Sequence, residues 1–178
     1  MTKVTKKSHV VAGLDIGTTK VACVIGMVGT TGEIDIVGVG VAPNPGMRQG
    51  IVINIEATVE AVKKAREEAE LMSALSIEEV WLSIGGNHIE SFDSNGMVAI
   101  RNQEVSAEDI HRVIDAAKAV AIPTDRQVLH VLPQNYKIDS QDGISDPIGM
   151  TGVRLEASVH IITGSKSAVQ NAIKCTEK

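Results

Sequence analysis

A short polar segment near the amino terminus carries the residues best suited to chemistry in this sequence. It contains Asp15, Gly17, Thr18, Thr19 and Lys20, between two apolar runs. A glycine lets the chain turn tightly, and successive backbone N–H groups in such a turn form a concave site for an anion. Two hydroxyl groups and a lysine ammonium add hydrogen bonds and positive charge. The segment therefore predicts a site for the phosphates of a nucleotide.

Asp15 needs a separate explanation, because a carboxylate repels phosphate. Its expected role is to hold Mg²⁺ through water, and only when a nucleotide is bound. The segment is not a Walker loop, because the spacing G-x-x-x-x-G-K-[ST] is absent and a strand is expected after it rather than a helix. The alternative is a polar hairpin turn with an incidental aspartate.

The elements predicted around this turn form an α/β arrangement. Apolar runs rich in β-branched residues predict strands at 9–16, 21–28, 33–41 and 79–84. Apolar residues at spacings of three and four predict a helix over 55–75, with Asn54 as its N-cap. The first three strands follow one another as a meander, which excludes an all-parallel dinucleotide-binding fold.

The pattern restarts after residue 86, so residues 87–163 are predicted to form a compact α+β insertion. Strands are expected at 88–92, 97–101, 128–138 and 153–163. Ser106 and Asp109 form a capping box at the start of a helix. Pro133 indicates an edge strand or a bulge. Residues 1–86 and a final helix at 164–178 would then belong to one domain that the insertion interrupts.

Composition excludes several classes of function. The formal net charge of the 178 residues is −5, and no more than two basic residues are consecutive, so no nucleic-acid partner is expected. Cys23 and Cys175 lack the spacing of a metal site and fit a reducing cytoplasm. The first residues lack the apolar core of a secretion signal, and no apolar run approaches the roughly 20 residues that span a bilayer.

Other candidate residues give weaker evidence of a functional site. His130 and His160 lie on two predicted strands and could share a metal ion, but without a third ligand they are interpreted as ordinary strand histidines. Ser83 and Ser91 have no histidine and aspartate arranged near them, so the sequence gives no support for nucleophilic catalysis.

The polar segment resembles the first phosphate loop of the actin, hexokinase and Hsp70 superfamily. Further blocks are similar to the FtsA family of bacterial cell-division proteins, at 36–40, 45–50, 69–72, 96–98, 126–136, 146–155 and 159–163. Together they cover nearly the whole chain from Val10 to Cys175. The resemblance implies a mixed α/β and α+β chain: an actin-like, ribonuclease H-like subdomain 1A, interrupted by an SHS2-type subdomain 1C.

The resemblance also implies a scaffold rather than an enzyme. Full-length members bind ATP with Mg²⁺, polymerise, and tether the FtsZ ring to the cytoplasmic face of the inner membrane at the division site. The five residues of the polar segment would contact the nucleotide phosphates and, through Asp15, Mg²⁺. Partner-binding residues are expected between Asn87 and Thr163, where an FtsN-like cytoplasmic tail, other divisome proteins and neighbouring copies would bind.

The family's second phosphate loop, adenosine-binding motif, subdomains 2A and 2B and membrane helix are not found in the sequence. The chain is therefore expected to be an amino-terminal part, truncated before the second actin-like lobe, that binds no nucleotide tightly and does not bind FtsZ. The alternatives are a fragment of another actin-superfamily ATPase or sugar kinase, and a pilus-assembly relative of FtsA. Neither a sugar-binding domain nor a catalytic base is evident, and the blocks at 96–98 and 128–133 favour FtsA.

Overall fold

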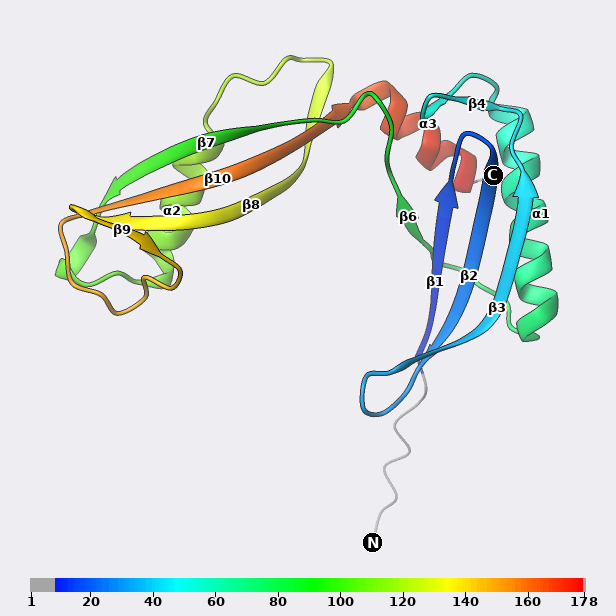
Figure 1. The fold of residues 1–178 in the computed structure, drawn as a ribbon, viewed down its shortest axis with the longest axis horizontal. Coiled ribbons are helices and arrows are strands. Elements are labelled where there is room, and N and C mark those ends of the chain that lie inside the picture. The colour runs from blue at the N-terminus through cyan, green and yellow to red at the C-terminus, as the bar shows by residue number, and fades with distance from the viewer. Residues whose placement is uncertain (1–8, 178) are drawn as a thin grey trace, which may run out of the picture. The chain divides into compact units, whose positions relative to one another are not determined.

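The computed structural model describes residues 9–177, which fall into two compact units (Figure 1). The first contains the described residues up to His88 and those from Ser167 onward, and the second contains residues 89–166. Each unit has a four-stranded sheet of its own, and the two sheets share no strand. The second unit covers nearly the same residues as the insertion expected at 87–163.

The sheet of the first unit has the strand order β3-β2-β1-β6. Its strands are β1 (His9–Ile16), β2 (Lys20–Val28), β3 (Ile34–Pro43) and β6 (Trp81–Ser83). β1, β2 and β3 are antiparallel neighbours, whereas β6 runs parallel to β1. The predicted meander is therefore confirmed. A ribbon of β4 (Met47–Arg48) and β5 (Ile51–Val52) was not predicted, because two residues show no periodicity.

Helix α1 (Ile55–Ser73) lies directly on β3 and β2 (Figure 1). Asn54 caps it as predicted, because its side chain accepts a hydrogen bond from Ala57 N at 3.0 Å. A Cβ on Gly40 would overlap the carbonyl oxygen of Ala65. One on Gly38 would overlap that of Ala69 in the same way. The helix backbone therefore touches the strand backbone, and only glycine fits between them.

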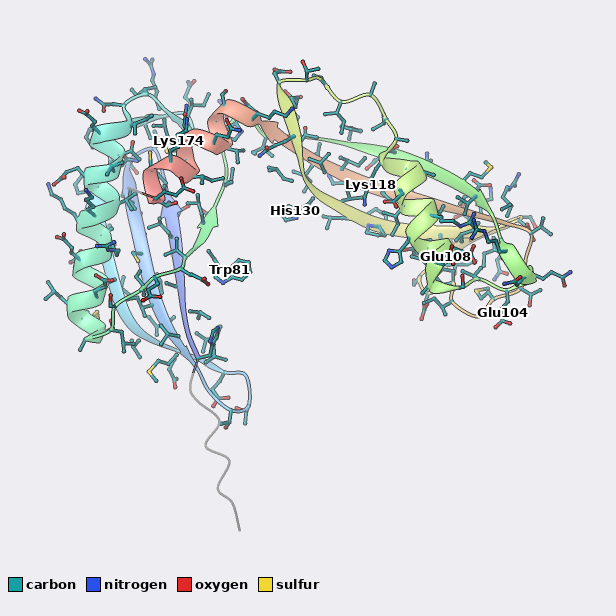
Figure 2. The ribbon with its side chains drawn as sticks, turned by 180° about the vertical axis from the view of Figure 1, so that it is seen from behind. Trp81, Glu104, Glu108, Lys118, His130 and Lys174 are labelled. Atoms are coloured by element: carbon teal, nitrogen blue, oxygen red, sulfur yellow. The ribbon has the colours of Figure 1, made fainter. Side chains whose placement is uncertain are left out.

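The opposite face of this sheet carries no helix of the described chain. Val39, Val41 and Trp81 are exposed there, and Trp81 projects from β6 with 81% of its surface accessible (Figure 2). Helix α3 (Lys166–Thr176) brings Cys175 into the same core as Cys23. Both cysteines are buried, and burial raises the pKa of the Cys23 thiol, so Cys23 is not a reactive thiolate.

The second unit is an antiparallel sheet of order β7-β10-β8-β9 with one helix on one face. Its elements are β7 (Glu90–Ala99), a 3₁₀ turn (Arg101–Gln103), α2 (Ala107–Lys118), β8 (Arg126–Ile138), β9 (Gln141–Ile144) and β10 (Arg154–Ser165). Alternate residues of β10 are buried, including Leu155, Val159 and Ile161. Helix α2 contacts β7 and β10.

The prediction of two short strands at 88–92 and 97–101 was wrong, because β7 is continuous. Ser94, Asn95 and Gly96 resemble a turn in sequence but lie inside the strand. Ser94 Oγ donates to the α2 carbonyl of Ala117 at 2.8 Å, and a Cβ on Gly96 would overlap the carbonyl oxygen of Val113. The small residues are there so that α2 can approach β7 closely.

The bulge indicated by Pro133 is confirmed. Along β8, Pro133 pairs with Val159 and Asn135 pairs with Ser158, so that Gln134 has no partner on β10. β9 pairs with β8 only at Tyr136 and Ile138. The outer edge of residues 126–135 therefore has no neighbouring strand within the described chain.

The capping box at the start of α2 is also confirmed. Asp109 is 1% exposed and accepts hydrogen bonds from Ser106 N at 3.0 Å and Ser106 Oγ at 2.7 Å. Arg112 forms an ion pair with its other carboxylate oxygen. The Ser106 hydrogen bonds, supported by Arg112, hold the pKa of Asp109 well below its usual range.

We expect Gly40→Ala to lower the free energy of unfolding of the first unit by about 2 kcal/mol, because the new methyl group overlaps the α1 backbone. Gly13→Ala is the matched control: a Cβ on this β1 glycine meets nothing within 4 Å. Urea unfolding followed through NMR signals of α1 compares the two. Equal stability of both variants would contradict the close packing of α1 on β3.

We expect Asp109→Asn to destabilise the second unit by about 2 kcal/mol at neutral pH. A carboxylate whose folded pKa lies below its unfolded pKa stabilises the fold fully above the unfolded value, and this contribution is lost as the pH falls toward the folded pKa. The difference from wild type should therefore shrink between about pH 5 and about pH 2. Urea unfolding through α2 signals measures it, with the exposed Asp115→Asn as control. A difference independent of pH would show that charge is not the cause.

Candidate nucleotide-phosphate site

The polar segment forms the tight turn between β1 and β2. Gly17 N donates a hydrogen bond to Lys20 O at 2.9 Å, which closes a loop with Thr18 and Thr19 at its tip. Thr18, Thr19 and Lys20 are exposed, and so is Asp15 near the end of β1. The structure thus brings together the five residues singled out in the sequence, at one end of the first sheet.

Asp15 lies on the sheet face opposite α1. In register it is flanked by Ala22 on β2 and Ser83 on β6. Ser83 Oγ donates to one carboxylate oxygen of Asp15. The second oxygen, Oδ2, is 3.7 Å from the position of a Cβ built on Gly17. One oxygen is therefore held by Ser83, while the other lies beside the turn.

The Thr18 side chain is held by the segment that contains Gly50. Its hydroxyl oxygen accepts a hydrogen bond from Gly50 N at 3.1 Å. Gly50 has φ +78°, and a Cβ on it would overlap the Cα of Gly86, so two glycine backbones touch at this point. The Thr18 hydroxyl keeps its own hydrogen for an acceptor such as a phosphate oxygen.

Three residues that contact the site were missed by sequence reasoning: Asn44, Gly50 and Ser83. Asn44 was not singled out in the sequence, and Ser83 was interpreted only as an unsupported nucleophile. The predicted strand at 79–84 was the one sequence feature that pointed to Ser83, but the residues of that strand do not show that it pairs with β1. These residues are 27, 32 and 68 positions from their partners in the turn and in β1.

No metal site is found in the second unit at the two histidines. His160 Nδ1 lies 2.7 Å from Asp93 Oδ1. His130 is exposed on β8, opposite Ile162 of β10 (Figure 2). Within residues 9–177, no group of three or more His, Cys, Asp or Glu side chains is arranged to hold a metal ion. In the same residues, no helix has the length and apolar character needed to cross a bilayer.

Comparison with known proteins identifies relatives for both units. Residues 86–163 match the family model of the SHS2 domain inserted in FtsA. The chain is 48% identical over 173 residues to the cell division protein FtsA of Pseudomonas aeruginosa, covering 97% of this chain and 42% of that protein. It is 49% identical over 173 residues to FtsA of Neisseria meningitidis, with the same coverage, and 43% identical over all 178 residues to FtsA of Escherichia coli K12. This chain belongs to the FtsA family.

The chain spans 42% of the length of these FtsA relatives and corresponds to their amino-terminal part. A solved structure of the PilM–PilN type IV pilus biogenesis complex matches 94% of this chain and 44% of its own, with a TM-score of 0.60 and 13% identity. That likeness shows the fold alone. The predicted fold class, an actin-like α/β unit interrupted by an SHS2 insertion, is therefore confirmed. The assignment to FtsA rests on the much higher identity to FtsA proteins.

Proposed function

We propose that this chain is the nucleotide-phosphate and partner-binding part of an FtsA-type scaffold of cell division. Full-length FtsA would bind ATP with Mg²⁺, polymerise, and tether the FtsZ ring to the cytoplasmic face of the inner membrane. The observation that supports nucleotide binding is the closed β1–β2 turn, which gathers backbone N–H groups, two hydroxyls and Lys20 beside the Asp15 carboxylate.

Each residue has a distinct role in this proposal. Gly17 permits the tight turn, and Thr18 and Thr19 offer N–H and hydroxyl groups to the phosphates. Lys20 supplies positive charge. Asp15 holds Mg²⁺ through water, and the cation offsets the repulsion between this carboxylate and the phosphates. The proposal assigns no group a catalytic role and gives the first unit a binding function.

We expect this chain to bind Mg-ATP only weakly, with a dissociation constant of about 1 mM or above, because the exposed turn contacts the phosphates from one side only. NMR titration should show shifts of the Thr18 and Thr19 amides that depend on Mg²⁺. Asp15→Asn should remove this dependence, and without Mg²⁺ it should bind ATP more tightly than wild type, because a neutral amide does not repel phosphate. A wild type whose turn amides do not respond at about 10 mM nucleotide would contradict the proposed site.

For the second unit, we propose that a basic, extended segment such as an FtsN-like cytoplasmic tail pairs with the outer edge of β8. This edge is unpaired over residues 126–135, and no Asp, Glu, Lys or Arg occurs from 127 to 136. Natural edge strands are usually protected by charge or cover, so a long neutral edge favours strand addition. Val128 and Leu132 are 41% and 43% exposed on it.

The net charge of the second unit indicates which kind of partner pairs with the outer edge of β8. Residues 89–166 contain eleven Asp and Glu against seven Lys and Arg. A basic tail is attracted to this unit, whereas a second copy of the chain carries the same excess of negative charge and is repelled. Pro133 and the two bulges of β8, at Leu129 and Gln134, limit regular pairing to short stretches, a length suited to a short peptide.

We expect Leu132→Lys to weaken binding of the FtsN-like tail peptide about tenfold or more, because it places a like charge on the edge where the peptide pairs. Ile148→Lys is the matched control, since it adds the same charge at an exposed loop residue. Fluorescence anisotropy of a labelled peptide measures both variants. Equal effects of the two would contradict the β8 site. Dimers of wild type in light scattering that Leu132→Lys abolishes would assign the edge to a second copy instead.

A further inference from the structure

Asn44 follows β3 and is buried, with only 4% of its surface exposed. A buried amide side chain must have hydrogen-bond partners, and the partners of this one lie at the turn between β1 and β2. Asn44 Nδ2 donates to Gly17 O at 2.9 Å, and Asn44 N donates to Thr19 O at 3.0 Å. One residue thus holds the carbonyl groups at both ends of the tip.

These bonds determine where the first N–H of the tip points. All peptide bonds described are trans, so the C=O of one residue and the N–H of the next point in opposite directions. Because the Gly17 carbonyl is directed at Asn44, the Thr18 N–H in the same peptide plane is directed away from it. An anion on that side meets a donor whose orientation is already fixed, which lowers the cost of ordering the site on binding.

Asn44 is in turn anchored to the start of α1. Its Oδ1 accepts a hydrogen bond from Gly46 N at 3.1 Å. The Gly46 carbonyl accepts from Ile53 N at 2.8 Å and from Asn54 N, the helix cap, at 3.0 Å. The side chain of Asn44 therefore uses its donor toward the turn and its acceptor toward the helix. Aspartate has the same shape but lacks the donor, and it would place a carboxylate against the Gly17 carbonyl oxygen.

We infer that Asn44 is the positioning residue of the phosphate turn: it orients the Thr18 N–H toward the anion without touching the ligand itself. This inference rests on the proposed nucleotide-phosphate function of the turn. It adds to that function Asn44, a residue of the connection after β3, outside the polar segment. The side-chain donor of Asn44 is required for the turn to bind phosphate.

The test compares wild type with Asn44→Asp and Asn44→Ala in titrations with Mg²⁺ and tripolyphosphate, followed through the Thr18 and Thr19 amides. Both variants should bind about tenfold more weakly at neutral pH. As the pH falls, the carboxylate introduced by Asn44→Asp becomes protonated and regains a donor. The affinity of this variant relative to wild type should therefore recover, whereas that of Asn44→Ala should not. A purely structural role would not separate the two variants in this way.

Gly40→Ala serves as the stability control, because it weakens the packing of α1 without contacting the turn. Its tripolyphosphate affinity should match that of wild type. Wild-type affinity in Asn44→Asp at neutral pH would overturn the inference and leave the proposed function intact. Absence of any wild-type response at the turn amides would overturn the proposed function, and the inference with it.

Discussion

Both units depend on the same constraint, a helix backbone that rests directly on the backbone of a strand. In the first unit α1 lies on Gly38 and Gly40 of β3, and in the second α2 lies on Gly96 of β7. Since no side chain fits between the backbones, the helix cannot shift along its sheet without a steric clash. The alanines that face these glycines, Ala65 and Ala117, are almost fully buried. Small residues therefore fix the position of the helix on the sheet, whereas larger side chains between the two would allow more than one helix position.

In the first unit the connection from β3 to α1 supports the phosphate turn. The chain leaving β3 passes Asn44 and Gly46 and enters α1 at Asn54. Gly46 itself has no room for a side chain, since a Cβ there would overlap the hydroxyl of Thr58 in the first turns of α1. The turn is thus oriented by hydrogen bonds from a connection that is itself packed against the first turns of α1. A loop that relied on its own residues would have to be ordered by the ligand.

What the sequence predicted well was local. The β1–β2 hairpin depends on apolar runs separated by a few polar residues, and Asn54, Ser106 and Asp109 act on residues within one helical turn. What it did not predict depends on distant partners. Ser83 contacts Asp15 only because β6 lies beside β1. Gly96 was interpreted as part of a turn, because the close approach of α2 that requires a glycine there cannot be inferred from the neighbouring residues. The fold class followed from family resemblance, whereas the supporting contacts of the site join residues far apart in the sequence.

The edges of the two sheets differ in a way that separates their roles. On the edge strand β3, Val41 N donates to a carboxylate oxygen of Glu68 from α1 at 2.8 Å, so a helix side chain occupies a position that another strand would need. At the end of β7, Arg112 of α2 donates to the carbonyl of Ala99 at 2.7 Å in the same manner. Residues 126–135 of β8 make two bulges against β10, at Leu129 and at Gln134, and have no strand on their outer edge within the described chain. In β3 and β7 a helix side chain thus engages one backbone group of the edge strand, whereas residues 127–135 of β8 are open and carry no Asp, Glu, Lys or Arg. This difference supports the proposal that β8 is the strand that pairs with a partner.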